Sequence, residues 1–595
     1  MQNEQFSLKN NVAIFVYWSQ KNELSENTVS YIKELKKISE TVLFISNSPV
    51  KSEHIKIIES TGTIFYQRDN DGFDFWGWKE GIFLLKDKIS KADNLILCNS
   101  SCFLAFENLN NVLVRMNSEA QLWGISSFEN KNIPFHIQSY FMVFKKKVLC
   151  DWDLFISFWK NLPRMRSWKD AVEYGELKLT QYYIKRGIVC RAIANRDLLP
   201  SKDVNPSFYY PIELFQNGSP LLKKKIFTEN YKLQLHFTNG NIPSSALSYV
   251  KEKKGRYAEI LEELIQQVSP SKLLQTLHLN FLVTGRAEKR SFRGSTAVIC
   301  FVYYDDMVGY ISRVLKRFSG IGNIYVVSPK KELLESYRTF LGNTDLNIEY
   351  RLQVNRGRNE AAYFLTCRDV WNRYDYVCAL HDKKTSHAKP ELLGIDFMKH
   401  CEQNLCPSST SILEVINLFE TNPLLGLLVP PFPFYGNFIF SAFNPLGQNL
   451  KSLQLINKKI FCGKLFSSKD EIDVFLAPFG GMFWARTKSF RLLWSSSLKF
   501  EDFPEEPLKT SDGTILHAME RVYPMLVREK GFYTGRLVNA DLVPCLYDNL
   551  IFFSIKMTRR ERFLFVLEEV ARKNLSQYPV LYKAIKSIYK KIKSS

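Results

Sequence analysis

Two groups of polar and charged side chains in the second half of the sequence follow apolar segments of strand length. The first group reads Asn355, Arg356, Gly357 and Arg358, and the second reads His381, Asp382, Lys383 and Lys384. Ligands of open α/β sheets bind at the carboxyl ends of strands, where both groups are expected. Guanidinium groups fork onto phosphate oxygens, and lysines act as point charges. The sequence therefore predicts a phosphate-binding site, with a solvated loop as the alternative.

The elements that must position these residues alternate between strand-like and helix-like segments. Strand-like segments occupy 11–17, 41–45, 63–66 and 94–98 in the first half, and 296–304, 323–327, 348–352 and 376–380 in the second. Segments with helical spacing lie between them, for example 29–38 and 311–318, which predicts mostly parallel sheets. Strand starts are about 30, 22 and 31 residues apart in the first half and about 27, 25 and 28 in the second. This agreement indicates a duplicated domain rather than coincidence.

Composition divides the chain into four predicted parts. Residues 1–235 form a first α/β domain, and residues 294–545 form a second one. Residues 236–293 are a helical linker, in which 248–268 has helical spacing and Pro270 is expected to end the helix. Residues 546–595 form a basic tail. The fold class is therefore α/β, with two tandem domains, a helical linker and a C-terminal amphipathic helix.

The net charge of +20 predicts a polyanionic partner. No helix-turn-helix, zinc-finger or RNA-binding signature is visible in the sequence, so no nucleic-acid partner is expected. The eleven cysteines include no C-x-x-C pair, which is typical of a reduced, cytoplasmic protein. No signal peptide is expected, and the most apolar long window, 424–443, contains three prolines and is a poor membrane span.

The tail concentrates positive charge, with eleven Lys or Arg against three Glu in residues 551–595. Leu581, Ile585, Ile588 and Ile592 would line one face of a helix, with lysines on the other side. Such a helix is expected to lie on an anionic bilayer, which predicts a peripheral location at the inner face of the cell membrane. Docking of the helix on the body of the protein is the alternative.

Several sequence blocks, taken in order, resemble the bacterial rhamnan-synthesis F family of glycosyltransferases. In the second half they are 355–358 (NRGR), 381–384 (HDKK), 422–427 (NPLLGL), 480–486 (GGMFWAR) and 512–521 (DGTILHAMER). In the first half they are 71–75 (DGFDF), 97–101 (LCNSS), 136–141 (HIQSYF) and Glu176 before Leu179 and Thr180. The sequence departs from the family pattern at Asn359, where an aspartate is common, and at Ser100, where an acidic residue is frequent.

The resemblance implies two tandem nucleotide-sugar-binding domains of the GT-A or Rossmann type. It implies a hexosyltransferase that moves a sugar, often rhamnose, from a nucleotide donor to a growing capsule, O-antigen or rhamnan chain. The acceptor would be lipid-linked or an oligosaccharide, and the transfer would invert the anomeric centre. One alternative is that only the second domain is catalytic and the first binds acceptor glycan. Another is a non-enzymatic scaffold of a polysaccharide assembly complex.

Such a transfer needs a base for the acceptor hydroxyl and groups that neutralise the leaving diphosphate. Asp512 is the first choice of base, with His517 beside it, and an N-terminal helix cap is the alternative for Asp512. The two arginines and two lysines named above would neutralise the diphosphate. Asp382 alone could hold part of a Mg²⁺ or Mn²⁺ ion, but neither half has an Asp-x-Asp motif. Metal-independent chemistry is favoured.

The remaining candidates are assigned to donor or acceptor binding. Acceptor or sugar contacts are expected from Trp484, Arg486, Glu520, Arg521, His136, Gln138 and Trp76. In the first domain the expected donor contacts are Asp71, Asp74, Asn99 and Ser100, and the expected base is Glu176. Buried aromatic packing for Trp484 and a surface position for Glu176 are the alternatives.

Overall fold

The computed structural model describes residues 10–555, except for 116–119, 195, 230, 287–291, 385–391, 436–437, 439–444, 509 and 511. The chain divides into two compact units, Met1–His278 and Leu279–Ser595. Residues 556–595, which carry the predicted membrane-binding face of the tail, lie outside the described residues. Within the described part of the chain, no helix combines the length and apolar character needed to cross a bilayer.

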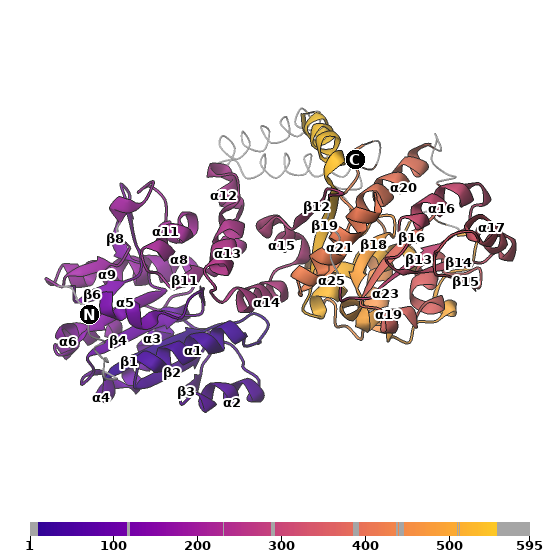
Figure 1. The fold of residues 1–595 in the computed structure, drawn as a ribbon. Helices are drawn as coiled ribbons and strands as arrows, with labels where there is room; N and C mark the ends of the chain where they lie inside the picture. Colours follow the sequence, from indigo (N-terminus) through magenta and orange to yellow (C-terminus); the bar gives the residue numbers. More distant parts are fainter. Residues whose placement is uncertain are drawn as a thin grey trace, which may run out of the picture. The chain divides into compact units, whose positions relative to one another are not determined.

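The first unit is built on a seven-stranded mixed sheet (Figure 1). In sheet order its strands are β10 (Cys190–Ala192), β6 (Leu122–Gly124), β9 (Phe141–Lys145), β4 (Asn94–Asn99), β1 (Asn11–Tyr17), β2 (Thr41–Ser46) and β3 (Ile64–Gln67). β9 runs antiparallel to both of its neighbours, and the other neighbouring pairs are parallel. Two short pairs, β5 (Cys102–Leu104) with β11 (Leu221–Lys223) and β7 (Ser127–Asn130) with β8 (Ile133–Ile137), lie outside this sheet.

The second unit is built on an eight-stranded mixed sheet. In sheet order its strands are β12 (Asn280–Val283), β19 (Tyr533–Asn539), β17 (Leu425–Val429), β18 (Phe483–Arg486), β16 (Tyr376–His381), β13 (Thr296–Phe301), β14 (Asn323–Ser328) and β15 (Ile348–Leu352). β18 is antiparallel to both of its neighbours, and all other neighbouring pairs are parallel.

Both sheets therefore follow one plan. Numbered by order along the chain within each unit, leaving aside β5, β7, β8 and β12, the strands lie in the order 7-5-6-4-1-2-3 in both sheets. The sixth strand is the antiparallel one in each case. Shared order and shared directions in seven strands are what a duplicated domain would produce, and they give each residue at a strand end a counterpart in the other unit.

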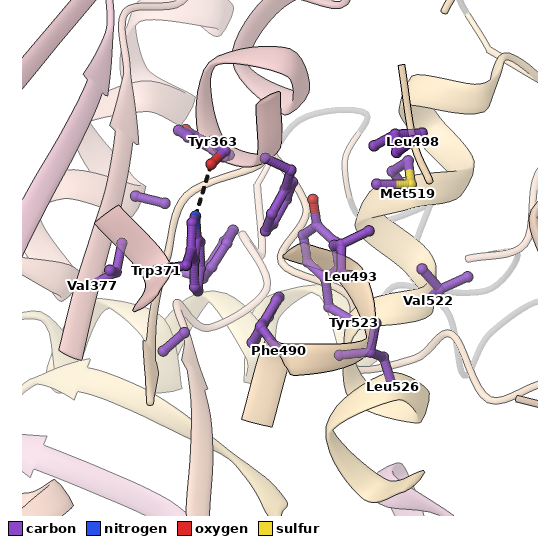
Figure 2. Packing of buried hydrophobic residues seen from close by; sticks show 14 of the residues in the cluster. Tyr363, Trp371, Val377, Phe490, Leu493, Leu498, Met519, Val522, Tyr523 and Leu526 are labelled. Atoms are coloured by element: carbon purple, nitrogen blue, oxygen red, sulfur yellow. Dashed lines mark hydrogen bonds between the residues drawn. The ribbon is translucent and has the colours of Figure 1, made fainter. Parts of the chain in front are cut away.

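Every residue of β1 is buried because both faces of the first sheet are covered. Val12, Ile14 and Val16 pack into one hydrophobic cluster, whereas Ala13 and Phe15 pack into another. In the second unit the corresponding core is rich in aromatic rings, and Figure 2 shows Trp371 with its indole N–H directed at Tyr363. That N–H donates to the Tyr363 carbonyl at 2.7 Å, so the polar atom of this buried ring is satisfied.

Helices cover the sheets, and those predicted at 29–38 and 311–318 each begin three residues earlier in the structure. The principal ones in the first unit are α1 (Glu26–Ile38), α2 (Ser52–Ser60), α3 (Phe73–Leu84), α7 (Trp152–Lys160) and α9 (Lys178–Ile184). In the second unit they are α16 (Val308–Lys316), α17 (Lys331–Leu341), α20 (Leu392–Leu405), α21 (Ser409–Thr421), α23 (Leu450–Lys459) and α25 (Ile515–Glu529). Helix α1, for example, starts after Ser25, whose hydroxyl accepts the N–H of Thr28 at 3.1 Å.

The predicted linker, 236–293, is divided between the two units. Its helices α13 (Ile242–Glu252), α14 (Tyr257–Gln267) and α15 (Pro270–Leu277) belong to the first unit, and its strand β12 belongs to the second sheet. Pro270 begins α15 rather than only ending a helix, because proline is tolerated in a first helical turn. Pro524 lies inside α25 and does not end it.

Gly357 gives a stability prediction for the turn after β15. Its φ is +81°, and a Cβ there would come within 2.6 Å of the Ala361 Cβ and 2.8 Å of the Phe503 ring. Gly357→Ala should therefore cost about 2–4 kcal/mol, combining left-handed strain and overpacking. Gly463→Ala is the matched control, because φ is +77° and no atom lies within 4 Å, so that only strain of about 1 kcal/mol remains. Hydrogen exchange in β13 measures the loss of unfolding free energy in each variant. Equal losses in the two variants would contradict the packing argument.

Candidate functional site

The fourth strand of each sheet ends in a polar residue beside the central strand. Asn99 ends β4 and pairs with Val16, and His381 ends β16 and pairs with Phe301. In each unit the N–H of the next residue then donates to the carbonyl of that same central-strand residue, from Ser100 at 3.0 Å and from Asp382 at 3.1 Å. Asn99 therefore corresponds to His381, and Ser100 corresponds to Asp382.

A left-handed glycine turn follows the third strand of each sheet. Gly72 (φ +75°) comes five residues after the end of β3, and Gly357 (φ +81°) comes five residues after the end of β15. In both turns the next residue also has positive φ and begins a helix, α3 in the first unit and α18 (Arg358–Ala361) in the second. Asp74 and Asn359, two residues after the glycines, are therefore counterparts.

A glutamate on the helix before the last strand faces the loop that leads into the antiparallel strand. In the first unit, Glu176 accepts the backbone N–H of Ser139 at 2.8 Å. In the second unit, the backbone N–H of Gly480 bonds to the Glu520 carboxylate and favours its charged form. Strand register makes Ser139 and Gly480 counterparts. Leu97 and Ala379 each lie two residues before the end of the fourth strand and pair with Met142 and Phe483, and Ser139 and Gly480 lie three residues before these partners. Glu176 and Glu520 thus occupy the same place in the two units.

Three side chains of the second unit surround one point, and a lysine acts on two of them electrostatically; the four are called the second-unit cluster: Asn359, His381, Glu520 and Lys383. A Cβ built on Gly481 would lie 2.7 Å from Asn359 Nδ2, 3.3 Å from Glu520 Oε1 and 3.4 Å from His381 Nε2. Gly481 leaves this space open, and its φ of +69° suits a residue without a side chain. Lys383 is half-buried, lies over the Phe397 ring at 4.8 Å and acts electrostatically on both His381 and Glu520.

The electrostatics of the second-unit cluster favour a basic carboxylate beside a neutral imidazole. Burial raises the pKa of Glu520, and Lys383, Arg521 and the Gly480 N–H oppose that rise. Burial, and after it the charge of Lys383, lowers the pKa of His381 to about 4. His381 is therefore uncharged near neutral pH, and its single N–H donates to one of the two carbonyls that its ring nitrogens face, that of Asp382 or that of Gly480. The neighbouring Glu360 is buried, and its pKa is raised well above the usual value by burial and by Glu520.

The counterpart set in the first unit is called the first-unit cluster: Asp74, Asn99, Lys223 and Glu176. The Asn99 amide donates to Asp74 at 2.8 Å, and burial raises the pKa of Asp74 to about 6 while Lys223 opposes the rise. Lys223 Nζ donates to Ser101 Oγ at 2.9 Å and lies over the Tyr140 ring at 4.7 Å. The buried His136 places Nε2 3.7 Å from Glu176 Oε1.

The predicted phosphate-binding arginines are engaged with the loop at residues 500–506 instead. Arg356 donates to the Phe503 carbonyl at 2.7 Å and to the Glu501 carbonyl at 3.1 Å. Arg358 forms a two-pronged ion pair with Glu506, at 2.7 and 3.0 Å. Lys384 pairs with Asp306. Asn355 is exposed at the turn.

Lys383 differs from these residues. Among the residues that the structure describes, no carboxylate forms an ion pair with its ammonium group, which leaves that group as the cation of the cluster.

Asp512 holds a neighbouring turn rather than joining the second-unit cluster. Its Oδ2 accepts the Gln448 N–H at 3.0 Å, and its Oδ1 accepts the Asn449 amide at 2.7 Å. Although burial acts in the opposite direction, these donors keep the pKa of Asp512 below its usual value. His517 bonds to Thr514 at 2.8 Å, and burial lowers the pKa of His517 to about 4. Arg521 donates to the Pro445 and His517 carbonyls and lies 3.9 Å from Asp512.

Two predicted sugar-binding residues of the second unit have structural roles. Trp484 is fully buried, and its indole N–H donates to the Leu405 carbonyl at 2.9 Å, so it is a core residue. Arg486 pairs with Tyr376, at the opposite end of β16 from His381, and binds carbonyls at the end of α21. The sugar-stacking hypothesis for Trp484 is therefore corrected.

Residues of the first unit that were predicted to contact donor or acceptor bind other protein groups instead. The Trp76 indole donates to the Pro163 carbonyl at 2.9 Å and covers Gly72, and Asp71 pairs with Arg164 at 2.9 Å. Gln138 accepts the Ser126 and Ser207 hydroxyls inside the unit, at 2.6 and 2.5 Å. β8 ends at Ile137, so His136 and Gln138 do not share one face of a continuous strand.

The Asp382 carboxylate does not fit the predicted partial metal site. Its Oδ2 accepts the N–H groups of Tyr303 and Tyr304, both at 2.8 Å, and burial raises the pKa of Asp382 to about 7. Its buried Oδ1 has no hydrogen-bond partner in the described structure. In the described part of the chain, no three His, Cys, Asp or Glu side chains are grouped as a metal site would need. A single oxygen atom is too few for Mg²⁺ or Mn²⁺, and no step below is routed through a metal.

Two cluster residues, Lys223 and Asn359, and the neighbouring Glu360 were not predicted from the sequence as part of a site. Asn359 and Glu360 directly follow the predicted turn around Gly357, so their position in the sequence could have marked them as site residues. Lys223 had no such signal, because it comes from β11, more than a hundred residues after Ser101. Two surface cavities, one including Asn108 and Arg115 and the other Gln454 and Lys469, share no residue with either cluster.

Comparisons with known proteins place the sequence among polysaccharide-related proteins. A family model described as rhamnan synthesis protein F matches residues 42–532. An uncharacterized protein, y4gN, of Sinorhizobium fredii is 25% identical over 162 residues, which is 27% of this chain and 42% of the relative. The virulence protein VirA of Vibrio anguillarum is 24% identical over 200 residues, 28% of this chain and 63% of the relative. The chain thus spans less than two thirds of the length of these curated relatives.

Solved structures with partial likeness include two transferases. The glycosyltransferase GlyE of Streptococcus pneumoniae TIGR4 is 12% identical, with a TM-score of 0.24, covering 65% of this chain and 88% of that one. A cytidylyltransferase of Leptospira borgpetersenii is 9% identical, with a TM-score of 0.21, covering 34% of this chain and 85% of that one.

The buried His381 gives a pH prediction. Its pKa is about 4 in the folded protein and 6.5 as an unperturbed group, so the unfolded chain binds the extra proton between these values. The unfolding free energy should therefore fall as pH drops from 6.5 towards 4, by about 3 kcal/mol from this residue. Asp382, with its raised pKa, acts in the opposite direction. The His381→Gln variant retains Asp382, so the difference between wild type and variant isolates the imidazole.

Urea unfolding of both proteins at several pH values, followed by hydrogen exchange in β16, measures this difference. His54→Gln, on α2 of the first unit, is the control and should follow the wild type. Parallel pH profiles for wild type and His381→Gln would contradict a neutral, buried imidazole.

Proposed function

The chain belongs to the rhamnan synthesis protein F family, and we propose that its second unit transfers a sugar from a nucleoside diphosphate donor to a hydroxyl group of a polysaccharide. The observation that carries the proposal is the Glu520 carboxylate, which lies with Asn359 and His381 around Gly481 and whose pKa Lys383 lowers through its charge. A carboxylate of raised pKa beside a lysine supplies the two groups that such a transfer needs, a base and a cation.

In the proposed step, the acceptor hydroxyl oxygen attacks the anomeric carbon of the donor sugar. The bond from that carbon to the diphosphate oxygen breaks, and its electron pair leaves with the diphosphate. Glu520 takes the hydroxyl proton, and the pKa rise caused by burial makes it a stronger base than an exposed glutamate. Lys383 balances the charge that develops on the leaving diphosphate. A single displacement of this kind inverts the anomeric centre.

The buried Glu360 positions this machinery without touching the donor. It accepts the Tyr523 hydroxyl and the Asn359 amide, the latter at 3.2 Å, so it joins α18 to α25. Burial and the charge of Glu520 raise the pKa of Glu360 well above its usual value, which favours the protonated form and limits negative charge beside Glu520. Asn359 is thereby held at the open space beside Gly481, where its amide can contact a donor oxygen.

The finer assignments rest on the family resemblance. The donor sugar is rhamnose or a related hexose, and the acceptor is a lipid-linked or oligosaccharide precursor of a capsule, O-antigen or rhamnan. The reaction takes place at the inner face of the cell membrane, where the basic residues of 551–595 would attract anionic lipid. Of the predicted catalytic residues, Asp512 is replaced as base by Glu520, since both Asp512 oxygens accept hydrogen bonds and its pKa is low.

Glu520→Gln tests the base directly. The amide retains the size of the carboxylate and can still accept the Gly480 N–H, but it cannot take the hydroxyl proton. Turnover should fall by about 10²–10⁴-fold while nucleoside diphosphate binding is retained. Glu529→Gln, an exposed position on the same helix, is the matched control and should behave as wild type. Turnover is measured as nucleoside diphosphate released from dTDP-rhamnose and UDP-glucose with an oligosaccharide acceptor; unchanged turnover in Glu520→Gln would refute the assignment.

Lys383→Met tests the cation. Methionine preserves much of the stem that packs on Phe397, so the change removes mainly the charge. The loss of transition-state stabilisation should be about 2–4 kcal/mol, seen in kcat/KM. Arg358→Ala is the comparison, because Glu506 already balances that guanidinium, and its loss should be smaller. An equal or larger effect of Arg358→Ala would indicate that the diphosphate binds at the turn that carries Arg358, as the sequence predicts.

A further inference from the structure

We infer that the first unit holds a second glycosyl-transfer site of its own, with Glu176 as base and Lys223 as the cation for the leaving diphosphate. The inference rests on the proposed function, because it carries the chemistry of the second-unit cluster to the first. What carries it is the strand-by-strand correspondence of the two sheets together with the contacts of the first-unit cluster.

The correspondence fixes three points of the site independently. Asp74 follows the left-handed glycine turn as Asn359 does, and Asn99 ends the fourth strand as His381 does. Glu176 bonds to the Ser139 N–H as Glu520 does to the Gly480 N–H. These three residues come from separate elements, α3, β4 and the helical turn Ala171–Leu177. A shift of one residue in strand register would have moved these residues apart, so their joint placement is specific.

The cation comes from a different element in each unit. Lys383 follows β16 directly, whereas Lys223 reaches the end of β4 from β11, where it bonds to Ser101. Its ammonium group is also the largest opposing influence on the raised pKa of Asp74. A lysine brought from elsewhere in the sequence to the same strand end supplies the second group of the reaction. This arrangement argues against a first unit that has merely kept the fold.

The step follows the same balance as in the second unit. The acceptor hydroxyl oxygen bonds to the anomeric carbon of a nucleoside diphosphate sugar, and the bond from that carbon to the diphosphate oxygen breaks with its electron pair. The hydroxyl proton passes to the Glu176 carboxylate. His136, with Nε2 3.7 Å from Glu176 Oε1, flanks the carboxylate, and Ser139 donates both its N–H and its hydroxyl to Oε2. These contacts hold the Glu176 carboxylate in place.

The two sites should take different substrates. The first-unit cluster offers a carboxyl at Asp74 and an amide at Asn99, where the second offers an amide at Asn359 and an imidazole at His381. A carboxyl accepts hydrogen bonds from sugar hydroxyls, whereas an amide also donates to oxygens. A chain with two such sites would form two linkages.

The test uses the full-length chain and four glutamate variants: Glu176→Gln, Glu520→Gln, the double variant, and Glu173→Gln as matched control. Glu173 is exposed and lies in the same helical turn as Glu176. Nucleoside diphosphate release is followed from UDP-glucose, UDP-galactose, UDP-N-acetylglucosamine, GDP-mannose and dTDP-rhamnose. Calorimetric binding of UDP, GDP and dTDP to wild type, Lys223→Met and Lys383→Met gives the number of sites per chain.

The expected result is two nucleoside diphosphates bound per chain, with one lost in each lysine variant. Glu176→Gln should lower nucleoside diphosphate release by about 10²–10⁴-fold for one donor, or in one of two kinetic components. Glu520→Gln should leave release from that donor, or that component, unchanged. Glu173→Gln should match wild type. Binding of one nucleotide per chain, unaffected by Lys223→Met, would overturn the second site and make the first unit a binding module. That result leaves the proposed function standing, which fails separately if Glu520→Gln and Lys383→Met change nothing.

Discussion

A carboxylate that meets a backbone N–H is the contact on which each site depends. Glu520 lies on α25, Gly480 lies in the loop before β18, and the contact joins the last helix to the antiparallel strand. Partial burial of a carboxylate is costly unless donors and a cation accompany it. The site therefore requires a close approach of this loop, which Gly480 and Gly481 permit with φ of +97° and +69°. The first unit meets the same requirement at Ser139, with the serine hydroxyl as an added donor.

The central strands of the sheets could be predicted from the sequence because they are buried on both faces. When both faces of a sheet are covered, an apolar run such as 11–17 indicates a buried strand. Seven of the eight predicted strands agree with the structure within one residue at each end. The exception, 296–304, ends at Phe301, because Tyr303 and Tyr304 turn to donate their N–H groups to Asp382. The linker was misjudged because tertiary packing, which the local pattern does not contain, decides that its helices join the first unit and its strand joins the second.

The site was predicted in position but not in its working residues. Strand ends and a glycine turn mark the place, and both are local features of the sequence. Whether a cation there is available depends on partners far along the chain. Arg358 is balanced by Glu506, 148 residues away, and Asp512 is engaged by Asn449, 63 residues away. Glu520 was recognised as part of a motif, but its role as base emerges only from the Gly480 and Gly481 geometry.

The two clusters share a frame but differ in charge, and this difference has a consequence for what they bind. In the second unit, Glu520 and Lys383 are the charged groups, since the low pKa of His381 keeps the imidazole neutral. In the first unit, Asp74 joins Glu176 and Lys223, and its pKa of about 6 makes it mostly ionised at neutral pH. The empty first-unit cluster is therefore more negative than the second-unit cluster by nearly one charge, although Asp382, with a pKa of about 7 where the first unit has Ser100, offsets part of this difference. The excess negative charge disfavours a diphosphate unless Asp74 is protonated or bonded to a sugar hydroxyl. Donor binding there should become tighter as pH falls towards 6, a dependence that Asn359 cannot confer on the second site.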